Sequence, residues 1–108
     1  MTEVLQLEVG GAALDSAFEA RSVLDADPTD LAGSAVRYEE AARSSVDVYG
    51  AFLYWLQAGR LWARAENMVR LLFAAASADD TRAELPAEHQ DAAAQAYSSF
   101  LDAAIVRH

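Results

Sequence analysis

The sequence has no cysteine and no lysine, and its 108 residues include only two prolines and five glycines. Without cysteine there is no disulfide scaffold, no thiolate zinc site and no nucleophilic thiol. Without lysine there is no Schiff-base chemistry and no P-loop, whose lysine contacts the phosphates. The serine-hydrolase motifs Gly-x-Ser-x-Gly and Ser-x-x-Lys do not occur either. These absences exclude several of the common catalytic classes.

Acids and alanine dominate what is present. There are 17 acidic residues against eight basic ones, all arginine, and the net charge is -9. Such a surplus of negative charge argues against direct binding of nucleic acid through the overall field. Alanine fills 25 of the hydrophobic positions, which favours helices that pack closely through small side chains. The length fits one core, so we predict one all-α domain over residues 1–108, a compact bundle of three to four helices.

The sequence carries no sign of a membrane span or a secretory signal. No apolar run is longer than the six residues of 51–56, far below the ~20 residues that cross a bilayer. Met1-Thr2-Glu3 begins the chain with an acid rather than with a basic segment. We therefore expect a cytoplasmic protein without membrane contact, with secretion without a cleaved signal peptide as the alternative.

The first part of the chain is predicted to hold an arm and one helix. Apolar and polar side chains alternate over 5–9, which is the period of a half-buried strand, and Gly10-Gly11 then interrupts the chain. Because a single strand has no other strand to pair with, we expect a helical turn or a flexible or extended arm over 1–11. A helix is expected over 12–24.

A second helix is predicted to begin at Asp27-Pro28 and to end near Gly50. Asp27 can cap the helix, Pro28 suits its first position, and Asp30 adds an acid to the first turn. Apolar and small residues then recur at spacings of four and three, as on one face of a helix.

The segment 51–76 is apolar around most of its circumference, so other protein must surround it. It is predicted to be one helix, either the central helix of the bundle or a helix shared with another subunit. Gly59 lies inside it, where glycine costs roughly 1 kcal/mol relative to alanine, so we expect another helix to cross closely there. Three apolar flanks recur at helical spacing, namely Tyr54, Ala58, Leu61, Ala65, Met68 and Leu72, then Trp55, Trp62, Val69 and Ala76, then Phe52, Leu56, Ala63 and Phe73. The remaining polar strip consists of Gln57, Arg60, Arg64, Asn67 and Arg70.

A polar connection is expected over 77–85, followed by the last helix. Thr81 and Glu84 have the spacing of a capping box, and Pro86 offers a second start just beyond it. The last helix is predicted to run to about Val106.

The carboxylates and histidines give no metal site. Glu39-Glu40 could open the Glu-Glu-x-x-Glu motif of all-α nucleotide pyrophosphohydrolases, but Arg43 stands where the third glutamate belongs. Adjacent helical residues point about 100° apart, so we interpret Glu39 and Glu40 as an exposed acidic face. Neither His89 nor His108 follows a glutamate at the spacing of a di-iron bundle. We predict no metal, no cofactor and no catalytic residue.

Two residue groups are candidates for binding. Arg60 and Arg64 are four apart and Arg70 adjoins their face, so the three could hold an anionic ligand or an acidic partner; ordinary solvation of an exposed strip is the alternative. The aromatic flank is richer in large apolar surface than alanine-rich neighbours can cover, and Trp and Tyr are enriched at interface centres. We predict that self-association buries the following interface residues: Tyr54, Trp55, Trp62 and Val69.

The stretch Asp27-Pro28-x-x-Leu31-x-x-x-Ala35, followed by Ala41-Ala42, resembles the opening of small helical proteins exported by type VII (ESX) secretion systems. Size, acidity, alanine content and the late Ala96-Tyr97 add to the likeness, which covers about 25–106. The resemblance implies a bacterial, helical protein that is secreted with a helical companion.

Two motifs depart from that family. Its members often carry Trp-x-Gly at a central turn, whereas Trp55 is followed here by Leu-Gln-Ala-Gly. Its export signal is Tyr-x-x-x-Asp/Glu, whereas Leu101 stands four residues after Tyr97.

From the sequence we expect a non-enzymatic helical protein that acts through protein–protein interaction, as a homo-oligomer or with a protein partner. A type VII-like secreted protein is one alternative. The other is an acidic inhibitor that imitates nucleic acid, which would need its carboxylates arrayed on one exposed face.

Overall fold

The structure, a computed structural model, describes residues 29–106. This part of the chain is all-α, with four helices, a short π-helical end and no strand, as the sequence predicted. The elements are α3 (Leu31–Ser44), α4 (Val48–Arg64), α5 (Met68–Arg82), α6 (Ala87–Leu101) and η1 (Asp102–Val106).

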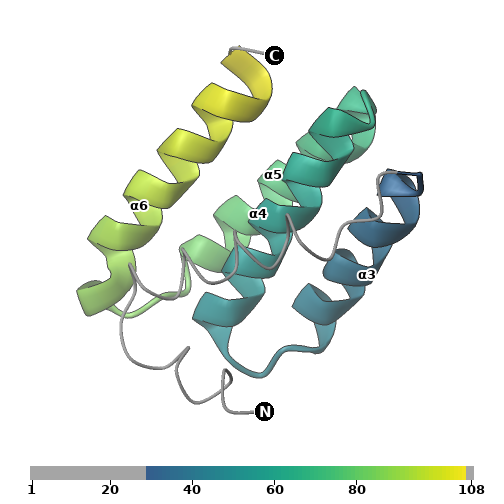
Figure 1. The fold of residues 1–108 in the computed structure, drawn as a ribbon. Coiled ribbons are helices and arrows are strands. Elements are labelled where there is room, and N and C mark those ends of the chain that lie inside the picture. Colours follow the sequence, from purple (N-terminus) through teal and green to yellow (C-terminus); the bar gives the residue numbers. More distant parts are fainter. Residues whose placement is uncertain (1–28, 107–108) are drawn as a thin grey trace.

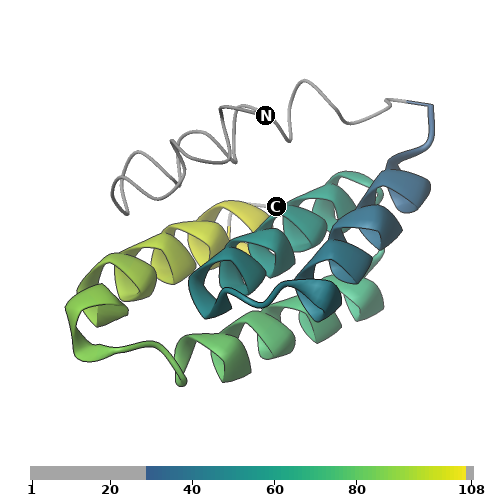
Figure 2. The same cartoon turned by 90° about the horizontal axis from the view of Figure 1, so that it is seen from below.

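Helix α4 lies at the centre of the bundle. Helices α3 and α6 flank it on either side, and α5 lies against it as a second layer (Figures 1 and 2). The large apolar side chains with almost no exposure come mainly from α4, joined by one residue of α5 and one of α6. They are Phe52, Leu53, Leu56, Leu61, Leu71 and Phe100. The prediction that protein surrounds the apolar segment 51–76 is confirmed for the part that lies in α4.

The prediction of one helix over 51–76 is wrong, because the chain reverses at Ala65-Glu66-Asn67. Glu66 adopts the left-handed conformation, with φ of 59°. Its N–H donates to the carbonyl of Ala63 and the N–H of Asn67 donates to that of Trp62, which is the bonding pattern of a Schellman turn. The Asn67 side chain then accepts from the N–H of Arg70 and caps α5. The apolar segment is therefore folded into a hairpin of two helices.

Helix α3 is shorter than predicted at both ends. Asp30, not Asp27, is the N-cap, because its carboxylate accepts from the N–H of Gly33 at 2.9 Å. The helix ends at Ser44 rather than near Gly50. Gly50 lies instead in the first turn of α4, where its N–H donates to the N-cap side chain of Asp47.

The connection between α5 and α6 also differs from the prediction. Helix α5 continues to Arg82, and the hydroxyl of Thr81 donates to the carbonyl of Ser77 inside that helix instead of capping the next one. The capping box with Glu84 is therefore wrong. The alternative start at Pro86 is confirmed, since Pro86 is the N-cap of α6.

The last helix and the close crossing at Gly59 are confirmed. Helical structure continues through α6 and η1 to Val106. A Cβ built on Gly59 would lie 2.5 Å from Cζ of the buried Phe100 ring, so only glycine permits this approach of α6 to α4. The arm predicted over 1–11 and the helix predicted over 12–24 lie outside the described residues.

Candidate functional site

Glu39 lies inside the fold, with 1% of its side chain exposed. The interpretation of Glu39 and Glu40 as one exposed acidic face is therefore wrong for Glu39 and right only for Glu40. Burial of a carboxylate requires charged or hydrogen-bonding partners. The hydrogen-bond partners come from α4 and α5, 23 and 31 residues away in sequence. The residues around Glu39 in the sequence therefore do not predict them.

Both carboxylate oxygens of Glu39 are engaged. Oε2 accepts from Nε1 of Trp62 at 2.7 Å, and Oε1 accepts from Nη2 of Arg70, also at 2.7 Å. Arg43 approaches to 3.8 Å, and the Arg70 guanidinium lies 4.6 Å from the centroid of the Trp62 ring. This network joins α3, α4 and α5 and engages both oxygens of the buried carboxylate. We interpret it as structural.

The structure separates the three predicted anion-binding arginines. Arg60 and Arg64 line one surface pocket of about 250 Å³ together with Ala63, Ala103 and Ala104. The Arg60 guanidinium also lies 5.8 Å from the Phe100 ring centroid. Arg70 belongs to the Glu39 network on the side of α3. A joint site of all three arginines does not follow from this arrangement, whereas a site on Arg60 and Arg64 remains a prediction.

The four predicted interface residues fall into two groups. Trp55 and Trp62 are buried in the core, and Tyr54 is half-buried with its ring 5.9 Å from that of Tyr38. Val69 is 77% exposed on α5. The turn at 65–67 divides the seam that was expected to run from Trp55 to Val69, so only Val69 lies at an open surface.

Helix α5 turns an apolar face outward. Met68 is 44% exposed, and Leu72 and Phe73 are each 50% exposed. The sequence placed these residues on the flanks of a surrounded helix, and that placement is wrong. The hairpin explains it, because α5 uses its opposite side, Leu71, Ala74, Ala75 and Ala78, to cover α4. We call the outward set the α5 face, which consists of Met68, Val69, Leu72, Phe73 and the exposed Ala76.

Charges of both signs border the α5 face. Beside its middle, Phe73 packs edge-on against Trp55 with the ring centroids 6.0 Å apart, and the Arg43 guanidinium lies 5.2 Å from the same indole. Glu66 is exposed at the N-terminal end of the face. At its C-terminal end stand Asp79, which pairs with Arg82, and Asp80, which is exposed.

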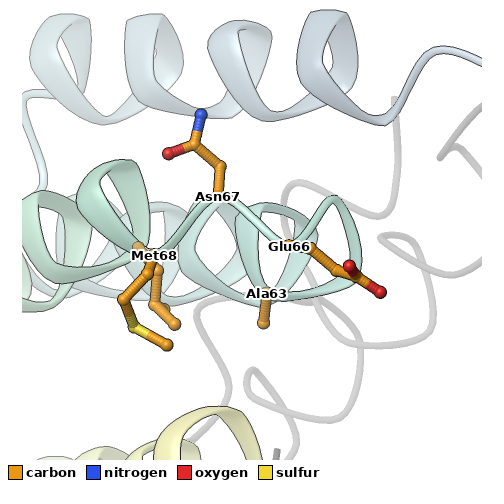
Figure 3. A pocket seen from close by; sticks show the side chains of 5 residues that line it. Ala63, Glu66, Asn67 and Met68 are labelled. Atoms are coloured by element: carbon orange, nitrogen blue, oxygen red, sulfur yellow. The ribbon is translucent and has the colours of Figure 1, made fainter.

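A shallow pocket of about 150 Å³ adjoins the N-terminal end of the α5 face. In Figure 3 the side chains of Ala63 and Met68 point to the same side of the turn, whereas Glu66 and Asn67 point elsewhere. Leu71 completes the lining. The pocket thus extends the apolar surface from Met68 toward α4.

Two further polar groups lie in the packed region. Gln57 is buried, and its Oε1 has no hydrogen-bond partner in the part of the chain that the structure describes, so the predicted polar strip does not reach solvent there. The hydroxyl of Tyr97 donates to the carbonyl of Ala75 at 3.2 Å. Burial raises the pKa of Tyr97 above its ordinary value near 10, and the nearby Asp79 raises it further.

Within residues 29–106 no group of three or more histidines and carboxylates is placed to hold a metal ion. No helix in that range is both long and apolar enough to span a bilayer. Residues 29–106 thus form a small helical bundle in which α5 exposes an apolar face. Comparison of the chain with protein-family models, curated proteins and solved structures gives no match.

Proposed function

We propose that this protein is a non-enzymatic binding protein that contacts another protein through the α5 face. The observation that carries the proposal is the exposure of four large apolar side chains, Met68, Val69, Leu72 and Phe73, side by side on one helix. Monomeric proteins expose single apolar residues freely, but a contiguous patch is typical of an interaction site. A helix that presents apolar side chains at spacings of three and four suits a second helix or an apolar groove.

The charges around the α5 face favour a protein over a membrane as the bound surface. Amphipathic helices that lie on membranes carry basic residues along the polar side. Helix α5 instead ends in Asp79 and Asp80, and the exposed Glu84 follows in the next turn. Anionic lipid headgroups and phosphates would be repelled at this end.

Site-specific photo-cross-linking in the cells that make the protein tests the proposal. A benzophenone amino acid replaces Leu72 in the full chain, and a matched chain carries it at Val46, which is fully exposed in the α3–α4 connection. We expect a discrete protein adduct from position 72 and none from position 46. Equal adduct yields from both positions, or none from either, would contradict the proposal.

A further inference from the structure

We propose that the chain also binds a small amphipathic anion, an apolar chain that ends in a carboxylate or phosphate group, between the C-terminal end of α4 and η1. This site goes beyond the protein contact proposed for the α5 face, which it adjoins at Met68. Three features support it, namely two pockets that meet, a pair of arginines at one end and an apolar lining toward the other.

The two surface pockets meet beside Ala63. The larger, of about 250 Å³, lies between the last turns of α4 and the η1 residues Ala103 and Ala104. The smaller, of about 150 Å³, continues from Ala63 along Met68 and Leu71, and Figure 3 shows that Ala63 and Met68 point to the same side of the turn. Because Ala63 lines both, we treat them as one site and call it the joint pocket. Together the two volumes reach the lower end of the roughly 300–1,000 Å³ that small-molecule sites enclose.

The α4 end of the joint pocket is basic. Arg60 and Arg64 lie one helical turn apart and both line it, and Arg64 is exposed. The Arg60 guanidinium lies 5.8 Å from the centroid of the Phe100 ring, a cation–π contact that holds its charge beside the pocket. Guanidinium groups bind carboxylates and phosphates through paired N–H donors. An oxyanion head group therefore suits this end.

The carbonyl groups at the end of α4 do not cancel this preference. Unpaired carbonyls at the C-terminal end of a helix repel an anion. Here the carbonyls of Leu61, Trp62 and Ala63 accept from the N–H groups of the turn at 65–67. Their partial charges are thereby offset, so the two arginines set the sign of the charge that a ligand meets.

The other end of the joint pocket is apolar with one acid at its edge. Ala63, Met68 and Leu71 supply carbon surface, and Glu66 is exposed beside them. The Glu66 carboxylate repels an anionic head at this end, so the head is directed to the arginines and the apolar chain lies along Ala63 and Met68. Asp102 precedes the η1 lining in sequence but lines neither pocket.

NMR titration of the isotope-labelled full chain tests the inference. The probes are octanoate and octyl phosphate, which have both parts, acetate, which has only the head, and octanol, which has only the chain, all below the concentrations at which they form micelles. We expect saturable shifts of the methyl signals of Ala63, Ala103 and Ala104 with octanoate, octyl phosphate or both, and the stronger of the two identifies the head group. Acetate and octanol should bind about tenfold more weakly or less. Octanol that binds as tightly as the anionic probes, or the lack of saturable shifts at these methyl groups, overturns the inference.

Three variants locate the ligand. Arg64→Gln should weaken the binding of the anionic probe about tenfold. Arg37→Gln is the matched control, because it makes the same change at an exposed arginine of α3 that lines neither pocket, and an equal loss in both variants overturns the inference. Ala103→Leu fills the pocket from an exposed position without a change of charge. It should abolish binding, and unchanged binding contradicts the site. Circular dichroism verifies that the variants remain folded.

One further variant separates this inference from the proposed function. Leu72 belongs to the α5 face and lines neither pocket, so Leu72→Asp should bind the anionic probe as the wild type does. Loss of probe binding in this variant places the ligand on the α5 face and overturns the inference. Photo-cross-linking from position 72 does not depend on the joint pocket, so either proposal can fail while the other stands.

Discussion

Glu39 and Glu40 are neighbours of identical chemistry that the fold treats in opposite ways. One is buried in a network with an indole and a guanidinium, and the other is exposed. The sequence around them predicts helix for both, but helical periodicity does not tell which of two adjacent acids faces inward when the partners are distant in sequence. The buried member could be found only by recognising that Trp62 and Arg70 need an acceptor between α3 and α5.

Replacement of Glu39 should destabilise the fold far more than replacement of Glu40. Glu39→Ala leaves the buried Trp62 N–H without an acceptor and releases the half-exposed Arg70, so we expect a loss of about 2–3 kcal/mol in the free energy of unfolding. Glu39→Gln should cost about 1 kcal/mol, because an amide has one acceptor oxygen for two donors. Glu40→Ala, the matched control, should change stability by less than about 0.5 kcal/mol. Urea unfolding measures all three, and equal losses at both positions would show that the network does not stabilise the fold.

Tyr97 should make stability fall at high pH. Its pKa is raised in the folded state, chiefly by burial, so the folded chain holds its proton more tightly than the unfolded chain does. The contribution is fully present below the unfolded pKa near 10 and is lost as the pH rises through the folded pKa. Urea unfolding at pH 8 and at pH values above 10 should therefore show a smaller decline for Tyr97→Phe than for the wild type. The other tyrosines are common to both proteins, and parallel declines would contradict the assignment.

At the scale of the helices, the largest error of sequence interpretation was the turn at 65–67. Schellman turns are usually marked by glycine at the left-handed position, but here that residue is Glu66. Asn67 was the available signal, because asparagine is a strong N-cap, yet in an apolar segment it also fits a polar strip. The N-caps Asp30, Asp47 and Pro86 are residue types that favour the start of a helix. Each of them lies within a few residues of a predicted helix boundary.

Glycine at position 66 should stabilise the hairpin. The left-handed conformation costs a residue with a Cβ about 1–2 kcal/mol, while glycine adds some entropy to the unfolded chain. Glu66→Gly is therefore expected to raise the free energy of unfolding by about 0.5–1 kcal/mol. Ala65→Gly is the control, because the backbone of Ala65 has the right-handed helical conformation. This substitution should lower the free energy of unfolding by a similar amount. Thermal and urea unfolding compare the two, and destabilisation by Glu66→Gly would mean that the Glu66 side chain itself supports the turn.

For the whole molecule, composition and apolar periodicity were enough to predict an all-α bundle and its most buried segment. They could not predict the layer order, because the same apolar flanks suit a helix surrounded on all sides and a helix folded back on itself. Because the sequence does not distinguish these two arrangements, it predicts Met68, Leu72 and Phe73 in the core, whereas the structure places them at the surface. The candidate binding surface is thus a consequence of one backbone reversal, which the periodicity of side chains does not encode.

The central position of α4 predicts a gradient of protection from hydrogen exchange. Helix α4 is packed against α3, α5, α6 and η1, so its amides can open only when several neighbours have left. The opening free energy measured for these amides should equal the free energy of global unfolding. The amides of η1, which is π-helical and half-exposed at the end of the described chain, should exchange through local opening. Glu39→Gln should then lower protection in α4 by the full loss of stability seen in urea and leave η1 unchanged. Hydrogen exchange followed by mass spectrometry measures both, and stronger protection in α3 or α6 than in α4 would contradict the central role of this helix.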